Sequence, residues 1–202
     1  LNYDWSKLPS RTQIIQNIIR KKNFKKYLEI GCDNNENFSK IFIEKKVGVD
    51  PLKGGTLRMT SDEFFKKNKI FFDIIFLDGL HTYEQTIKDI NNSLNFLSKE
   101  GMILIHDCLP KKIWNQIVPR IYGHWNGDVW KAIVQSRTYK HADTYTIKAD
   151  HGLGLILRRP NKNILKIEKD NFKNLKFAEY FSRHVEFMNP INIDQLDNII
   201  KN

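Results

Sequence analysis

The chain has 202 residues, of which 41% are apolar and two are cysteines, and its formal net charge is +10. This length and composition predict one globular domain with a sizeable core, and they exclude a disulfide scaffold. No run reaches the roughly 18 apolar residues of a membrane span, and the first residues, LNYDWSKLPSR, lack the basic and apolar regions of a signal peptide, so we expect a cytoplasmic protein.

The first half of the sequence alternates predicted helices and strands. An isoleucine stripe at Ile14, Ile15, Ile18 and Ile19 predicts a first helix that covers a sheet. The elements expected next are a strand at 27–31, a helix through about residue 43, strands at 47–50 and 56–59, a helix from residue 60, a strand at 72–77, a helix from residue 82 and a strand at 102–105. Such alternation predicts a parallel sheet with helices on both faces.

Two of these helices have a predicted start. Thr60 with Glu63, and Thr82 with Gln85, have the spacing of a capping box, in which the side chains at the two positions bond to each other's backbone N–H groups. We therefore expect helices to begin directly after Thr60 and Thr82.

The pattern changes after residue 128. A helix is expected at 128–139, and strands at 144–148 and 153–157 flank a short turn, which predicts an antiparallel hairpin at the edge of the sheet. A linker at 160–163 leads into a helical, amphipathic tail. We expect a single domain over 1–202, with a core over about 24–159 and the tail over about 163–202.

Polar side chains follow nearly every predicted strand. In an open parallel sheet, ligands bind beyond the carboxyl ends of the strands, near the point where the strand order reverses. The polar or small residues at these positions are Glu29, Gly31, Cys32, Asp50, Thr60, Ser61, Asp78, Gly79, His81, His106, Asp107 and Cys108. Loops without a function have no need of a carboxylate at nearly every strand end.

Gly31 and Asp50 indicate a nucleotide-like ligand without naming it. Gly31 suits a tight turn that lets the backbone approach a ligand, and Asp50 lies about 20 residues further on, where an acid can bind ribose hydroxyls. The segment holds one glycine and not GxGxxG, so a pyrophosphate-binding loop is poorly supported.

Taken segment by segment, the chain resembles a small bacterial class I methyltransferase that depends on S-adenosylmethionine. The resemblance rests on YLEIGC, VGVDP, MTSDEFF, FDIIFLDGLHTYEQTIKDI, GMILIHDCLP and NGDVWKAI, and it spans roughly residues 27–158. FLDGLHTYEQ and IHDCLP are its most specific parts. It implies a Rossmann-like, doubly wound, mostly parallel sheet that ends in an antiparallel hairpin.

The resemblance also implies a place for the cofactor. Glu29, Gly31 and Cys32 would lie at the methionine end of S-adenosylmethionine, Asp50 would hold the ribose, and Asp78 would touch the cofactor from the neighbouring strand. Thr60, Ser61 and Asp62 would lie by the adenine. The loop after Gly31 departs from the family because it has asparagines in place of further glycines, and asparagine also tolerates positive φ.

Three residues are candidates for catalysis. If the methyl acceptor is a hydroxyl, its proton must leave, and His81, His106 and Asp107 lie at strand ends where a base can reach it. The alternative is that each histidine only caps backbone or packs a loop. Asp78 and Asp107 end neighbouring strands, so a divalent cation such as Mg²⁺ between them is a second way to acidify the acceptor. The alternative there is that Asp78 touches the cofactor and Asp107 orients a histidine.

The cysteines, two tryptophans and the hairpin turn allow further predictions. Cys32 and Cys108 follow strands expected to lie two spacings apart, about 9.5 Å, which exceeds the roughly 7 Å that a disulfide allows, so we predict free thiols. Trp125 is a candidate for lining an acceptor pocket, whereas Trp130 fits core packing on a helix. We expect Asp150 and His151 in the hairpin turn to lie away from the site.

Three other functions remain as alternatives. They are a dinucleotide-dependent Rossmann enzyme, a binding module that keeps only the fold, and a nucleic-acid methyltransferase. The lysines are scattered in short pairs, which favours solvated faces over a nucleic-acid surface. The expected acceptor is a small molecule with a hydroxyl, such as a sugar or a phosphorylated or nucleotide-linked metabolite, and an oligomer stays open.

Overall fold

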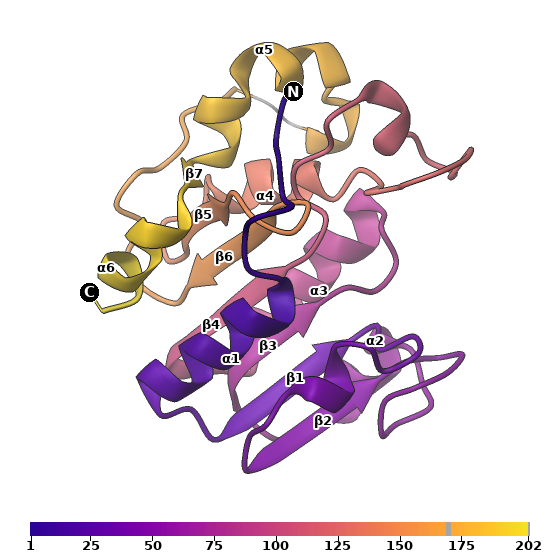
Figure 1. Ribbon diagram of the computed structural model, residues 1–202, viewed down its shortest axis with the longest axis vertical. Coiled ribbons are helices and arrows are strands. Elements are labelled where there is room, and N and C mark those ends of the chain that lie inside the picture. The colour runs from indigo at the N-terminus through magenta and orange to yellow at the C-terminus, as the bar shows by residue number, and fades with distance from the viewer. Residues whose placement is uncertain (169–170, 202) are drawn as a thin grey trace.

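The computed structural model describes residues 1–168 and 171–201. Within these residues the chain builds one seven-stranded sheet with helices on both faces (Figure 1). The strands are β1 (Lys26–Ile30), β2 (Lys45–Val49), β3 (Phe72–Leu77), β4 (Leu97–Ile105), β5 (Asp143–Ile147), β6 (Leu153–Leu157) and β7 (Pro190–Ile191). Their order is β2-β1-β3-β4-β6-β5-β7, with β1 to β4 mutually parallel and β6 antiparallel to both β4 and β5. The predicted doubly wound, mostly parallel sheet is confirmed.

The sheet lies between two layers of helices. The helices are α1 (Arg11–Lys22), α2 (Ser61–Lys67), α3 (Tyr83–Asn95), α4 (Trp130–Ser136), α5 (Phe177–Met188) and α6 (Leu196–Lys201). One face of the sheet packs against α2, α3, α4 and α5, and the other face packs against α1, α6 and a short 3₁₀ turn at Phe38–Lys40. The chain reverses its direction of winding between β1 and β3, so the switch point of the sheet lies there.

The central strands are rich in apolar residues because both of their faces are buried. In β3, Ile74 and Phe76 pack into the core under α1, whereas Ile75 and Leu77 pack into the core under α3. A strand buried on both faces has no solvent side, so it reads as a continuous apolar run instead of an alternating one.

The starts of the helices follow from capping. Ser10 and Gln13 form a capping box at α1, and the predicted box of Thr60 and Glu63 forms at α2. The predicted box at α3 is wrong: the helix does begin after Thr82, but this residue makes no side-chain cap bond. Gln85 instead donates to Ser61 Oγ at 3.1 Å, which ties α3 to the first residue of α2.

The helix predicted between β1 and β2 is wrong. Only the 3₁₀ turn at Phe38–Lys40 forms there. Asp33 and Asn35 have φ values of 44° and 64°, and this left-handed backbone cannot belong to a right-handed helix. The Asn35 side chain accepts a bond from the Gly55 N–H at 2.7 Å, so the loop is tied to the segment after β2.

The short strand predicted at 56–59 is also wrong. The structure has a single parallel bridge there, between Val49 and Leu57. Gly54 and Gly55 turn the chain with φ values of 67° and 66°, and α2 begins a few residues later. The connection is therefore too short for the crossover that a further parallel strand would need.

The hairpin is confirmed, but its expected position at the edge of the sheet is wrong. β6 pairs with β4, β5 lies beyond it, and β7 adds to β5 on the outside. The turn between β5 and β6 therefore lies beside the end of β4, where the N–H of Cys108 donates to the Gly152 carbonyl at 3.0 Å.

The chain after residue 160 packs on both faces of the sheet. Tyr180 and Phe187 of α5 join the core beneath α4, and Leu196 and Ile200 of α6 join the core beneath α1. Among the described residues, no helix is both long enough and apolar enough to cross a membrane.

Candidate active site

Two cavities open at the carboxyl ends of β1, β2, β3 and β4. The first, of about 460 Å³, lies by the start of α2, and we call it the α2-side cavity. The second, of about 320 Å³, lies by the start of α1, and we call it the α1-side cavity. Both are lined by Gly31, Asp33 and Asp78, so they meet at the switch point between β1 and β3.

Gly31 brings the two strand ends together. Its φ is +86°, and a Cβ atom there would lie 2.3 Å from the Asp78 carbonyl oxygen. No other residue fits this position, so the backbone after β1 packs directly on the backbone after β3. Gly31 was expected to let the chain approach a ligand, and it lines both cavities.

Asp50 lines the α2-side cavity as an organised carboxylate. Its Oδ1 accepts bonds from the N–H groups of Leu52 and Lys53 at 2.8 and 2.9 Å, and its Oδ2 accepts one from Asp33 at 2.9 Å. Burial opposes ionisation, but these backbone donors outweigh it and lower the pKa of Asp50. A fixed anion is therefore present at the end of β2, facing the cavity.

The start of α2 forms the far wall of this cavity. Thr60, Ser61 and Asp62 all line it, and these are the residues that the resemblance expects by the adenine. Gln85 donates to Ser61 Oγ at 3.1 Å and to Asp62 Oδ1 at 3.2 Å, and burial raises the pKa of Asp89 behind them to about 6. The wall is thus a set of small polar groups at the edge of an apolar pocket.

Glu29 and Cys32 lie in the α1-side cavity and not in the α2-side one. Glu29 accepts a very short bond from the Tyr27 hydroxyl and one of 2.8 Å from Asn37 Nδ2, and burial raises its pKa to about 7. Both cysteines are free, as predicted, and burial raises the pKa of the Cys32 thiol to about 12. Cys32 is therefore a neutral wall residue and not a nucleophile.

His106 is held by three carboxylates. Its Nδ1 lies 3.2 Å from Asp78 Oδ1 and 3.2 Å from Asp107 Oδ2, and its Nε2 lies 3.3 Å from Asp150 Oδ1. Burial disfavours the imidazolium, but the carboxylates outweigh burial and raise the pKa of His106 well above its usual range. The Asp78 carboxyl is stabilised in return, so its pKa is lowered. This arrangement favours a permanent imidazolium over a free base.

His81 lies between the same two carboxylates but is more accessible. Its Nε2 is 3.3 Å from Asp78 Oδ1, its Nδ1 is 3.5 Å from Asp107 Oδ2, and its ring stacks on Trp125 with centroids 5.3 Å apart. Burial lowers the pKa of His81, but Asp78 and Asp107 reverse this, so the net shift is upward. The ring lines the α1-side cavity, with 20% of its surface exposed.

Three tryptophans differ in how close they lie to the site. Trp125 stacks on the candidate base, although it lines neither cavity. Trp130 is fully buried in the core, as its helical position indicated, and Trp114 is exposed. Trp125 therefore lies next to the site through His81 and does not line either cavity, which differs from the expected pocket position.

Sequence reasoning missed two charged residues of the site. Arg11, the first residue of α1, has Nε 3.8 Å from Asp78 Oδ2 and Nη1 3.6 Å from Asp150 Oδ1, and its N–H also donates to Asp150. We expected Asp150 away from the site because the hairpin was placed at the sheet edge. That expectation is wrong, because β6 and not β5 pairs with β4. The two hairpin orders have the same local sequence signal, so no pattern in the chain distinguishes them.

Comparisons with known proteins agree with this architecture. Residues 16–108 match the sequence profile of a family described as a methyltransferase domain, although this is less than half of the chain. No curated protein matches the chain.

Several solved structures have a similar fold. They include a methyltransferase from Podospora anserina with S-adenosylhomocysteine bound (TM-score 0.57, 17% identity, covering 76% of this chain and 80% of that one). An O-methyltransferase from Bacillus cereus, also with S-adenosylhomocysteine, has a TM-score of 0.56 at 10% identity and covers 76% and 84% of the two chains. An O-methyltransferase of tomaymycin synthesis from Streptomyces achromogenes, with S-adenosylmethionine, has a TM-score of 0.55 at 10% identity and covers 74% and 79%. Identities this low show that the fold is shared.

Proposed function

We infer that this chain, a class I methyltransferase by its domain match and its fold, transfers a methyl group from S-adenosylmethionine to a hydroxyl group of a small molecule. One observation carries the inference. An apolar cavity with a fixed carboxylate meets a polar cavity with histidines at the switch point of the sheet, so a cofactor and an acceptor can face each other across Gly31 and Asp78.

The α2-side cavity suits the nucleoside half of the cofactor. A volume of about 460 Å³ is in the range of small-molecule pockets. Asp50 would accept bonds from the ribose hydroxyls through its remaining lone pairs, and Ser61 and Asp62 would lie by the adenine. Gly31 leaves room for the methionine part to pass the end of β1 toward Glu29, whose carboxylate attracts the ammonium group of the cofactor.

The α1-side cavity suits the acceptor. Its walls include Arg11 and His81, which can donate hydrogen bonds to hydroxyl or phosphate oxygens. These donors favour a sugar, or a phosphorylated or nucleotide-linked metabolite, over an apolar acceptor. Five carboxyl residues line the same cavity, so the positive charge of the chain as a whole is not concentrated at this site.

In the proposed reaction, the acceptor oxygen attacks the sulfonium methyl in line, the S–CH₃ bond breaks and the acceptor O–H proton leaves. S-adenosylmethionine supplies the methyl group and departs as neutral S-adenosylhomocysteine. We assign the proton transfer to His81 in its neutral form, because it is the more accessible histidine and Asp78 and Asp107 hold its ring. His106 lies within 3.3 Å of Asp78, Asp107 and Asp150, and these carboxylates raise its pKa, which favours the imidazolium as the centre of this cluster. Asp107 thereby acts as a positioning residue for His81.

The space between the carboxylates of Asp78 and Asp107 is a poor site for Mg²⁺. His106 Nδ1 lies 3.2 Å from an oxygen of each carboxylate, which is the bridging position that a cation would occupy. Arg11 adds positive charge on the other oxygen of Asp78. Mg²⁺ also prefers a shell of oxygen atoms. The proposed reaction therefore uses no cation at Asp78 and Asp107.

The experiment that tests the proposal measures ligand selectivity and turnover together. We expect S-adenosylhomocysteine to raise the melting temperature of the protein, and NAD to leave it unchanged. A panel of sugars, sugar phosphates and nucleotide sugars, assayed with methyl-labelled S-adenosylmethionine, should then give a product labelled on a hydroxyl oxygen. Stabilisation by NAD alone would identify a dinucleotide enzyme instead, and label transfer only to a nucleic acid would identify the other methyltransferase class.

A further inference from the structure

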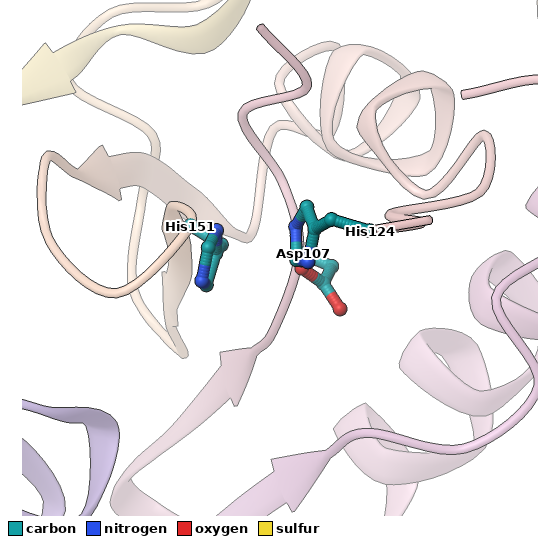
Figure 2. Close-up of side chains that lie close together, drawn as sticks. All are labelled: Asp107, His124 and His151. Atoms are coloured by element: carbon teal, nitrogen blue, oxygen red, sulfur yellow. The ribbon is translucent and has the colours of Figure 1, made fainter. Parts of the chain in front are cut away.

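We propose that Asp107, His124 and His151 form a binding site for one transition-metal ion, such as Zn²⁺ or Co²⁺, next to the α1-side cavity. Figure 2 shows the three side chains gathered from three separate segments of the chain. Asp107 follows β4, His124 lies in the loop before α4, and His151 lies in the turn between β5 and β6. One carboxylate oxygen and one nitrogen from each histidine lie within 4.8 Å of one another.

The two oxygens of Asp107 face different partners. Its Oδ2 faces His81 and His106, at 3.5 and 3.2 Å. Its Oδ1 lies 3.7 Å from His124 Nε2 and accepts a bond of 2.7 Å from Asn126 Nδ2. One carboxylate oxygen thus belongs to the histidines of the proposed transfer site, and the other points to the proposed metal site. Asn126 orients that second oxygen, as outer partners of metal ligands commonly do.

The backbone holds two of the three ligands in place. The N–H of Leu109 donates to the His151 carbonyl at 2.9 Å, next to the bond between Cys108 and Gly152, so the hairpin turn is bonded to the end of β4. Asp107 and His151 both have left-handed backbone, with φ values of 60° and 63°. Non-glycine residues adopt this conformation rarely, and it is common at ligand-binding positions where the surrounding structure enforces it.

The third ligand is the adjustable one. The His124 ring stacks on the His151 ring with centroids 4.0 Å apart, and 47% of the His124 side chain is exposed. A tetrahedral Zn²⁺ site has bonds of about 2.0–2.2 Å and therefore donors about 3.3 Å apart. Rotation of the exposed His124 ring can close the remaining gap. The exposed side also leaves a path from solvent and room for a water molecule on the ion.

The chemistry of the donors decides which ion binds. Two imidazole nitrogens and one carboxylate oxygen suit Zn²⁺, Co²⁺, Ni²⁺ or Fe²⁺, whereas Mg²⁺ and Ca²⁺ prefer oxygen ligands. Three protein ligands leave at least one position open for water. The proposed site therefore differs from a Mg²⁺ site at Asp78 and Asp107 both in its ligands and in the ion that it selects.

The test is a titration of the metal-free full-length chain with Co²⁺, followed by visible absorption, with no cofactor or acceptor present. We expect saturation at one ion per chain. His124→Ala and His151→Asn should each weaken binding by about 100-fold or more. Asparagine is used at position 151 because it tolerates positive φ. The control is His141→Ala, because His141 is exposed and belongs to no potential metal-ligand cluster of residues 1–168 and 171–201. This variant should bind Co²⁺ as the unmodified chain does.

A variant at His81 separates this site from the neighbouring cluster of Asp78, His81 and Asp107. His81→Ala should retain Co²⁺ binding. Loss of binding in this variant with retention in the His124 and His151 variants would assign the ion to the other cluster and overturn the proposal. Absence of any stoichiometric Co²⁺ or Zn²⁺ binding would overturn it as well. None of these readings depends on methyl transfer, so the proposed function stands or falls separately.

Discussion

The two cavities of the site are built from different parts of the chain. The α2-side cavity is lined only by residues between 30 and 89, and most of them directly follow β1, β2 and β3. The α1-side cavity combines Arg11 with Glu29, His81 and His106, and Asp150 from the hairpin completes its charge network. Residues 30–89 are therefore enough to line the cavity proposed for the nucleoside half of the cofactor, whereas the other cavity also draws on the start of α1, the end of β4 and the hairpin turn.

The strongest way to separate the two cavities is His81→Ala. Loss of the general base should lower kcat by about 10²- to 10⁴-fold. The dissociation constant of S-adenosylhomocysteine, measured by calorimetry, should stay within about twofold because His81 does not line the α2-side cavity, where the nucleoside half of the cofactor is proposed to bind. His141→Ala is the matched control. An unchanged kcat would exclude His81 as the base, and an equal loss of cofactor affinity would mean that the cavities do not act separately.

Asp50→Ala should have the opposite effect, which is weaker cofactor binding with kcat nearly unchanged. Because Asp50 is a buried carboxylate at the α2-side cavity, its removal should weaken S-adenosylhomocysteine binding by about 10- to 100-fold. At saturating cofactor, kcat should remain close to that of the unmodified chain. Asp50→Asn keeps one acceptor oxygen and should fall between the two. Wild-type affinity in the alanine variant would remove Asp50 from the cofactor site.

Glu29, in the α1-side cavity, should make the free energy of unfolding depend on pH. Burial raises its pKa from an ordinary 4.5 to about 7 in the folded protein. The folded state therefore binds this proton more tightly than the unfolded state, and the contribution to stability present below pH 4.5 is lost as the pH rises through 7. Glu29→Gln cannot titrate, so its stability relative to the unmodified chain should improve by about 2 to 3 kcal/mol between pH 5 and pH 8. Urea unfolding at several pH values measures this, and parallel curves would show that Glu29 is ionised throughout.

Arg11 gives the smallest expected effect. Arg11→Lys keeps the positive charge but loses the planar group that reaches both Asp78 and Asp150. Because the pairs are partly exposed, we expect the KM of the acceptor to rise by only about 3- to 10-fold, with cofactor affinity unchanged. A change in cofactor affinity alone would assign Arg11 to the α2 side.

The fold and the cofactor side could largely be predicted because their signals are local. An isoleucine stripe marks α1, continuous apolar runs mark β3 and β4, and polar residues mark the strand ends. Asp50, Ser61 and Asp62 line one cavity, and their contacts with the ribose and adenine of a cofactor stay predictions. The helix predicted before β2 failed because left-handed backbone at Asp33 and Asn35 interrupts it, and the residue types there allow both outcomes.

The acceptor side could not be predicted to the same extent because it depends on strand order. The sequence around Asp150 and His151 correctly predicts a hairpin turn, but a hairpin can join β4 through either of its strands. Pairing of β6 with β4 moves Asp150 from the expected edge of the sheet to 3.3 Å from His106. Only the tertiary pairing, set by apolar contacts on both faces of β6, contains that information.

The central position of β6 also has a consequence for biosynthesis. Asp150 follows His106 by 44 positions in the chain, and β6 follows Asp150. A ribosome therefore exposes β1 to β4, with the complete lining of the α2-side cavity, before the strand that carries Asp150 to His106 exists. Until β6 is made, the flank of β4 that later pairs with it has backbone N–H and C=O groups without a strand partner. An unpaired strand edge can pair with other chains, so the addition of β6 also protects this flank of β4 from such contacts.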